Sequence, residues 1–118
     1  MTLIDDVAIE AITSLQKPGK PDLFAKIVAL FEQNSPDLID SIVRAADGGD
    51  ADSARAAAHS LKSSSAYLGA VEFSSLCKRI ELAAREDDLA REAEAVERLP
   101  DCFKDTIEAL QPYLQKAA

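Results

Sequence analysis

The chain has a single histidine, His59, and the residues around it suggest chemistry on its imidazole. At 100° per helical residue, Arg55, Lys62, Ser63 and Ala66 share a face with His59, at offsets of three, four and seven residues. A neutral imidazole is a nucleophile at physiological pH, and nearby cations can offset the charge of a phosphoryl group. Small neighbours leave room for a partner protein. The pattern therefore predicts a phosphoryl carrier on a helix surface.

The other face of this predicted helix is apolar. Ala54, Ala57, Leu61 and Leu68 fall within about 40° of the side opposite His59 and would form the buried stripe. Because the imidazole must then point outward, we do not expect a histidine packed in the core.

Two other chemistries fit these residues less well. The serines at 63–65 could supply a hydrolase nucleophile, but no Gly-x-Ser-x-Gly turn is present and no acidic residue is placed to orient His59. A closed zinc site would need a ligand beyond His59, Cys77 and Cys102, and Cys77 falls on a buried stripe. We expect no metal site, and both cysteines to be reduced thiols packed as small hydrophobes.

Apolar residues recur at spacings of three and four throughout, so every predicted element is a helix. The first begins after Thr2 and stops at the breaker in residues 17–21. The second begins near Asp22, and Ser35 and Pro36 begin either a third helix or a kinked continuation. Residues 47–50 close this segment and cap the next helix.

The three remaining predicted helices follow closely. One spans about Ala51 to Leu68 and ends at Gly69, and another follows almost at once. The residues 87–88 cap a long last helix, which Pro100 should kink. The residues expected to face the core, helix by helix, are Ile4, Ala8, Ala11, Ile12 and Leu15; Leu23, Ile27, Leu30 and Phe31; Leu38, Ile39, Ile42 and Val43; Ala54, Ala57, Leu61 and Leu68; Phe73, Leu76, Cys77, Ile80 and Ala84; Leu89, Ala93, Val96, Phe103, Ile107, Leu110 and Leu114.

Short connections force neighbouring helices to run antiparallel. The sequence therefore predicts an all-α fold, an up-and-down antiparallel four-helix bundle with one or two additional short N-terminal helices. The length of 118 residues suits one domain over 1–118.

Charge and hydropathy exclude several classes of partner. The net charge of -8 argues against nucleic acid and against an anionic membrane surface, which clustered Lys and Arg would bind. No run approaches the roughly 20 apolar residues of a spanning helix, and Met1 leads into two aspartates instead of a basic signal region. We expect a soluble cytoplasmic protein.

The segment at residues 58–70, AHSLKSSSAYLGA, resembles the phosphorylation motif of histidine phosphotransfer (HPt) domains, roughly H-x-L-K-G-x-x-x-x-[LV]-G. A Cys-x-x-[LI] segment follows about eight residues later in the family, and here residues 77–80 match it. The resemblance covers nearly the whole chain. One departure is Ser63, which replaces the usual glycine and bears on how closely a receiver can dock.

The resemblance implies roles for particular residues. His59 would be the phosphoacceptor, Lys62 the phosphoryl-stabilising lysine and Gly69 the turn glycine between the two hairpin helices. It also places Glu81 and Arg85 beside the histidine, on one flank of the fifth predicted helix.

The resemblance also implies the partners. A receiver domain's phosphoaspartate would donate to His59, which would pass the phosphoryl group to another receiver, with a hybrid sensor histidine kinase upstream. The sequence has no nucleotide site, we expect no cofactor, and any Mg²⁺ would be held by the receiver. A monomer is expected.

Independently of the resemblance, Ile9 lies off the first helix's stripe and, with Ile12, is a candidate for an exposed docking patch.

Two alternatives remain open at this point. The chain would be a non-catalytic helical adaptor if it bound receiver or kinase domains while its histidine stayed idle. It would instead be one domain of a hybrid sensor kinase if it had been cut from a longer protein, although Met1 and the absence of linkers favour a free-standing protein.

Overall fold

The computed structural model describes residues 3–14 and 23–117, and this part of the chain contains helices and no strand. The predicted all-α class is therefore confirmed. In chain order the elements are α1 (Asp6–Thr13), α2 (Leu23–Gly48), α3 (Ala51–Tyr67), α4 (Val71–Arg85), the 3₁₀ turn η1 (Leu89–Glu92) and α5 (Ala93–Ala117).

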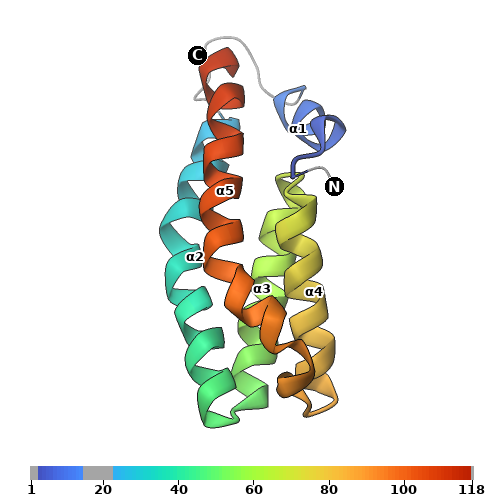
Figure 1. Ribbon diagram of the computed structural model, residues 1–118. Coiled ribbons are helices and arrows are strands. Elements are labelled where there is room, and N and C mark those ends of the chain that lie inside the picture. Colours follow the sequence, from blue (N-terminus) through green and yellow to red (C-terminus); the bar gives the residue numbers. More distant parts are fainter. Residues whose placement is uncertain (1–2, 15–22, 118) are drawn as a thin grey trace.

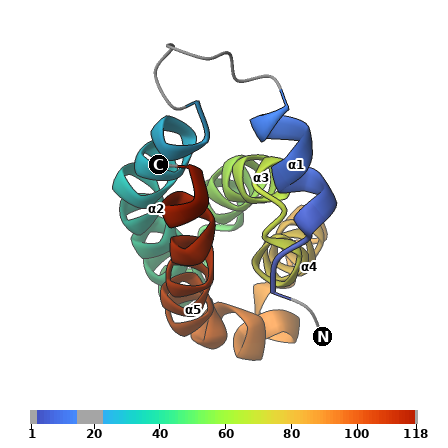
Figure 2. The ribbon, with the colours of Figure 1, turned by 90° about the horizontal axis from the view of Figure 1, so that it is seen from above.

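The four long helices, α2 to α5, form an up-and-down antiparallel bundle (Figure 1). Viewed from above, they surround one core, with α3 packed against both α2 and α4, and α5 packed against the same two helices (Figure 2). The single short helix α1 lies at the end of the bundle where α3 turns into α4 (Figure 1). This is the predicted bundle, with one additional N-terminal helix.

Turn residues set the ends of the helices. Gly49, with φ of 73°, follows the end of α2, and the Asp50 carboxylate caps α3 by accepting a hydrogen bond from the Ser53 backbone N–H at 3.2 Å. Gly69, also with φ of 73°, ends α3, and Asp87, with φ of 53°, ends α4. The predicted boundaries at residues 47–50 and at Gly69 are confirmed.

Two predicted helix starts are corrected. Residues 35–36 lie inside one continuous helix α2, so the alternative of a continuation is right. Ser35 is buried inside this helix, so it does not cap a new one. The core-facing stripe of α2 continues on both sides of Pro36.

The first helix begins at Asp6 instead of after Thr2, with the Asp5 side chain accepting from the Val7 N–H at 3.0 Å. Its predicted stop in residues 17–21, and Leu15, lie outside the described residues.

The predicted last helix is also corrected. A 3₁₀ turn, η1, occupies residues 89–92, and α5 begins only at Ala93. Ala93 is exposed, and the core seam instead includes Ala95, Leu99 and the buried Thr106. The reason is that the tight turn shifts the phase of the helix that follows it. Pro100 lies inside α5, which bends along its length in Figure 1.

Three phenylalanines join the helices at the centre of the core. The rings of Phe31 in α2, Phe73 in α4 and Phe103 in α5 have centroids 5.4 to 5.9 Å apart. The predicted buried residues of α3 and α4 are all buried. The prediction for Leu30 is wrong, because its side chain is 48% exposed at the surface of α2.

No helix in the described ranges has the length and apolar character needed to cross a membrane. Cys77 and Cys102 are free thiols, and both are buried.

Candidate functional site

His59 lies near the middle of α3, on its solvent-facing side. The side chain is 57% exposed, whereas Ala54, Ala57 and Leu61 on the opposite side are buried in the core. The aspartate cap and a run of alanines, which have the highest helix propensity, favour a regular helix here. The helix therefore presents the imidazole outward, as its periodicity indicates.

A buried carboxylate from α4 contacts this imidazole. Glu81 is only 2% exposed, and its Oε2 lies 2.7 Å from Nδ1 of His59. Its other oxygen, Oε1, accepts a hydrogen bond from Lys62 Nζ at 2.6 Å. Arg85, one turn along α4, donates from Nη2 to Oε2 at 3.3 Å. One carboxylate thus holds three basic side chains from two helices.

The sequence-based statement that no acidic residue is placed to orient His59 is wrong. Glu81 is 22 residues away along the chain and reaches His59 only because α4 folds back against α3. The resemblance placed Glu81 and Arg85 beside the histidine, and the structure brings both to the same cluster.

The electrostatic surroundings keep Glu81 ionised. Burial by itself would raise the pKa of Glu81, but hydrogen bonds from Lys62 and His59, with the charges of Lys62 and Arg85, outweigh it. The pKa of Glu81 is therefore lower than that of an ordinary glutamate. An ionised carboxylate can only accept hydrogen bonds, so Nδ1 of His59 must be the donor. In the neutral imidazole, the nucleophilic lone pair then lies on Nε2.

The α3–α4 hairpin sets the register of this cluster. Gly69 makes the turn, and the Ser74 hydroxyl donates to the Lys62 carbonyl oxygen at 3.2 Å, which ties the two helices together beside the site. Small buried side chains in α3, among them Ala58 and Ser65, let α4 approach closely. The hairpin thus carries Glu81 to the level of His59.

Gly69 also allows α1 and the residue before it to pack closely against the turn between α3 and α4. Its carbonyl oxygen accepts from the Asp5 N–H at 2.7 Å. A Cβ on Gly69 would lie 2.7 Å from the Asp5 carbonyl oxygen and 3.0 Å from the Ala8 Cβ. Both the left-handed backbone and the close approach of α1 therefore require glycine here.

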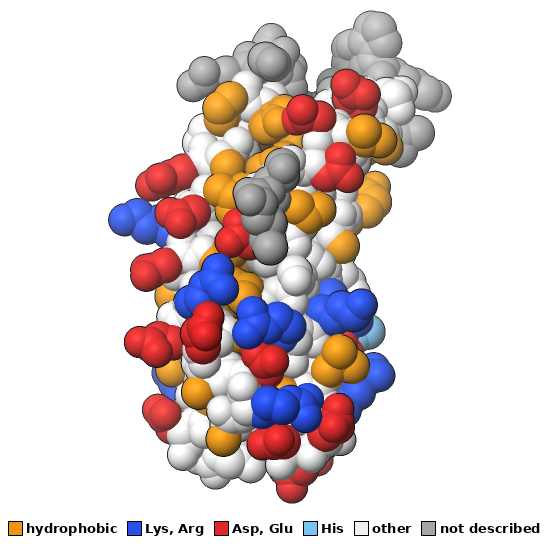
Figure 3. Space-filling view, turned by 45° about the vertical axis from the view of Figure 1, so that its right-hand side comes forward, with side chains coloured by type: hydrophobic (Ala, Val, Ile, Leu, Met, Phe, Trp, Pro, Cys, Tyr) orange, Lys and Arg blue, Asp and Glu red, His pale blue; other side chains and the backbone are white. Residues whose placement is uncertain are grey.

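The structure leaves three predicted residues outside the hydrogen-bonded cluster. Arg55, Ser63 and Ala66 are exposed on the same face of α3 as His59. Within residues 3–14 and 23–117, their side chains make no hydrogen bond or ion pair, and their roles stay predictions. Figure 3 shows Lys and Arg side chains gathered beside the histidine on this otherwise acidic molecule.

The predicted docking patch on α1 is wrong. Ile9 is 4% exposed and Ile12 is 2% exposed, so both belong to the core. Because α1 lies across the end of the bundle, its inward face is the one that carries these isoleucines, and Ala11 is exposed instead. The large aliphatic side chain exposed on α1 is Val7, at 71%.

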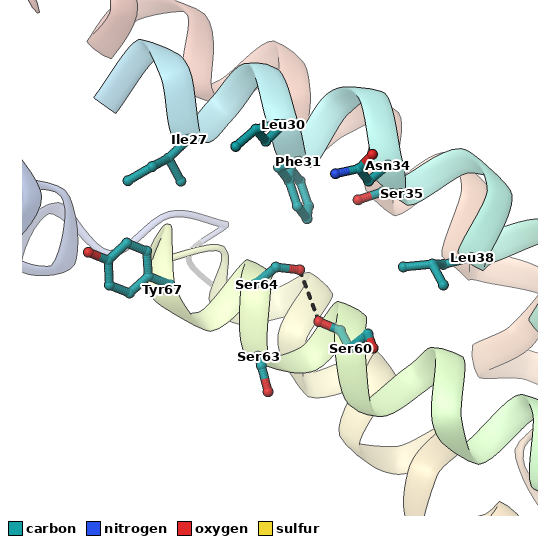
Figure 4. Close-up of a pocket in the computed structure, with 10 residues that line it drawn as sticks. All are labelled: Ile27, Leu30, Phe31, Asn34, Ser35, Leu38, Ser60, Ser63, Ser64 and Tyr67. Carbon is teal, nitrogen blue, oxygen red and sulfur yellow. Dashed lines mark hydrogen bonds between the residues drawn. The ribbon is translucent and has the colours of Figure 1, made fainter. Parts of the chain in front are cut away.

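A groove that the sequence analysis did not predict lies between α2 and α3, beside the histidine. Its volume is about 550 Å³. The residues that line it, shown in Figure 4, are Ile27, Leu30, Phe31, Asn34, Ser35 and Leu38 from α2 and Ser60, Ser63, Ser64 and Tyr67 from α3. The signal that could have indicated this groove is a spacing of three and four residues along one face of α2, shared by Ile27, Leu30, Asn34 and Leu38. Its wall in α3 begins at Ser60, the residue after His59.

The geometry agrees with a comparison of the sequence with protein families. A family model for the Hpt domain matches residues 26–112, which include the whole of α3 and α4. The chain belongs to the Hpt domain family. As an Hpt domain, it is a histidine phosphotransfer protein of a two-component phosphorelay, a system in which such domains work with receiver and kinase domains.

A solved structure has the same fold as this Hpt domain. The crystal structure of histidine-containing phosphotransfer protein B (HptB) from Pseudomonas aeruginosa PAO1 superposes with a TM-score of 0.83. The two chains are 24% identical, and the match covers 97% of this chain and 96% of that chain. Among curated proteins, none matches this chain significantly.

Proposed function

We propose that His59 is the phosphoacceptor of this Hpt domain, and that it shuttles a phosphoryl group between receiver-domain aspartates. The observation that carries the proposal is the 2.7 Å contact between Glu81 Oε2 and His59 Nδ1, together with the exposure of the ring. This contact fixes the ring orientation and its tautomer, so that Nε2 faces the partner with a lone pair.

The transfer breaks one bond and forms one. The Nε2 lone pair attacks the phosphorus of the receiver's phosphoaspartate, the P–O bond of the acyl phosphate breaks, and the aspartate leaves as a carboxylate. The Nδ1 proton stays on the ring. Because the new P–N bond makes the ring more positive, the ionised Glu81 becomes a stronger hydrogen-bond partner as the reaction proceeds. The return step to a second receiver reverses these events.

Lys62 is proposed to stabilise the transferring phosphoryl group. Its ammonium group donates to Glu81 through one N–H and has two further donors. These can reach phosphoryl oxygens as charge develops, which is electrostatic stabilisation of the transition state. Arg55 and Arg85, both exposed near the ring, are proposed to add positive charge to this surface.

The partner is proposed to cover both His59 and the groove between α2 and α3. A receiver must bring its aspartyl phosphate to near-attack distance, about 3 to 3.5 Å from Nε2, and so must cover the surface around the ring. The groove begins at Ser60, and half-exposed Leu30 and Tyr67 give it apolar area to bury. Ile9 and Ile12, being buried, take no part.

The proposed partners and the absence of a cofactor follow from this reaction. The proposed partners are receiver domains and a hybrid sensor histidine kinase that supplies the phosphoryl group. No cofactor of its own is proposed, and the Mg²⁺ that helps phosphoaspartate chemistry would belong to the receiver. We propose that the protein acts as a cytoplasmic monomer and engages neither nucleic acid nor a membrane.

The test uses a panel of receiver domains charged with phosphoryl groups. Each is mixed with the wild-type protein and with His59→Gln, and acid-labile, base-stable label is followed by gel and mass spectrometry. We expect label on the wild type alone, with circular dichroism showing that the variant is folded. If receivers bind the wild type but none labels it, the protein is an idle adaptor and the proposal is wrong.

A further inference from the structure

Three consecutive serines follow Lys62, and they differ in what their hydroxyls bind. The Ser64 hydroxyl donates to the Ser60 carbonyl oxygen at 3.0 Å, shown as the dashed line in Figure 4, and the Ser65 hydroxyl donates to the Leu61 carbonyl oxygen at 2.6 Å. The Ser63 hydroxyl has no hydrogen-bond partner in the described part of the chain. Ser63 is exposed on the α3 wall of the groove, where Figure 4 shows its side chain.

Ser63 lies where the reacting ring and the groove meet. It is four residues after His59, so the two Cβ atoms are about 5 to 6 Å apart on the helix surface. At 100° per residue, Lys62 falls on one side of His59, toward α4 and Glu81, and Ser63 falls on the other side, toward α2. Ser63 also lines the groove.

A partner that reaches Nε2 of His59 must therefore cover Ser63. When it does, the exposed Ser63 hydroxyl is removed from solvent. A hydroxyl that loses water without gaining a partner weakens binding, whereas one that meets a donor or acceptor does not. The hydroxyl thus favours receivers with a polar group opposite it and disfavours receivers with an apolar one.

We propose that Ser63 is a specificity-determining residue, whose hydroxyl hydrogen-bonds a polar group on the receivers that exchange phosphoryl groups with His59. The inference rests on the proposed function and adds a rule for partner choice. The discrimination from one such hydrogen bond is on the order of 10-fold between receivers that satisfy the hydroxyl and receivers that do not.

The experiment measures second-order transfer rates from a panel of phosphorylated receiver domains to four proteins. These are the wild type, Ser63→Ala, Ser63→Gly and the control Ser75→Ala, which changes an exposed serine on α4 that lines none of the described grooves. Phosphoramidate, a small phosphodonor that covers no docking surface, is used in parallel to label His59 directly.

We expect Ser63→Ala and Ser63→Gly to slow transfer about 10-fold from the best wild-type donors and to leave poor donors unchanged or faster. Labelling by phosphoramidate and all Ser75→Ala rates should stay at wild-type values. If the variants change every receiver by one factor, or change none, Ser63 does not determine specificity. If Ser63→Gly speeds transfer and Ser63→Ala has no effect, the size of the side chain at this position sets the rate, and the proposed hydrogen bond is refuted.

These outcomes separate this inference from the proposed function. Wild-type protein that receivers label at His59, without receiver-dependent effects at Ser63, overturns the inference alone. Wild-type protein that no receiver labels at His59 overturns both, whether or not phosphoramidate labels it.

Discussion

The carboxylate of Glu81 and the imidazole of His59, 22 residues apart in the chain, are joined by a 2.7 Å hydrogen bond between α4 and α3. The carboxylate is almost completely buried, while the ring is more than half exposed. The contact therefore combines a rigid anchor with a reactive group that a partner can reach.

Replacing Glu81 with glutamine is expected to slow phosphoryl transfer to His59 about 10-fold, because a neutral hydrogen bond at Nδ1 replaces a charge-assisted one. Gln keeps the size of the side chain, so the bundle should stay folded. The measurement is the rate of transfer from a phosphorylated receiver, with circular dichroism as a check of folding. A wild-type rate in Glu81→Gln would show that the charge of this carboxylate does not assist transfer.

Replacing Lys62 with alanine is expected to slow transfer, or to shorten the lifetime of the phosphohistidine, by about 10-fold. Arg85 and His59 still contact Glu81 in this variant, so the carboxylate keeps partners. Label on His59 is followed over time after the donor is removed. Lys104→Ala, an exposed lysine on α5, is the matched control and should behave as wild type. Equal transfer and decay rates in all three proteins would remove Lys62 from the mechanism.

The lowered pKa of Glu81 predicts a dependence of stability on pH. Burial alone would raise the pKa, but the hydrogen bonds from Lys62 and His59 and the charge of Arg85 lower it. A lowered carboxyl pKa gives stability that is fully present above the unfolded value, about pH 4.3, and is lost as the pH falls through the folded value.

Urea unfolding between pH 7 and pH 3 measures this contribution. The wild type should lose more free energy of unfolding below about pH 4.3 than Glu81→Gln does, since all other carboxyls are common to both proteins. Parallel profiles for the two proteins would contradict the lowered pKa.

Gly69→Ala is expected to destabilise the protein by about 1 to 3 kcal/mol. Its φ of 73° disfavours a side chain, and the new Cβ would meet the Asp5 carbonyl oxygen at 2.7 Å. Gly48→Ala is the matched control, because nothing lies within 4 Å of its Cβ position. Urea denaturation should show a large loss for the first variant and little change for the second. Equal effects would mean that α1 does not pack closely on this turn.

The thiols of Cys77 and Cys102 are expected to react slowly in the native protein. Burial, with a smaller effect of nearby Cys102, raises the pKa of the Cys77 thiol to about 12. Burial is also the main cause that raises the pKa of Cys102. Reaction with a thiol-specific reagent at pH 8 should be at least about 100-fold slower in buffer than in urea. Rapid native labelling of either cysteine would show that its helix opens readily.

The sequence by itself determined which faces of the central helices are buried. Apolar spacing placed Ala54, Ala57 and Leu61 in the core and so pointed His59 outward, because an α-helix fixes the angle between residues. Turn signals at residues 47–50 and at Gly69 located the ends of α2 and α3, since caps and left-handed glycines act locally.

Tertiary structure decided how the helices pack against one another. Periodicity put Ile9 off the stripe of α1, yet it is buried, because the crossing angle of a short helix depends on the bundle end that it covers. The contact of Glu81 with His59 depends on the register of α4 against α3, and the groove beside Ser63 depends on how far α2 stands from α3. Such relations arise from packing between distant segments, which no local pattern specifies.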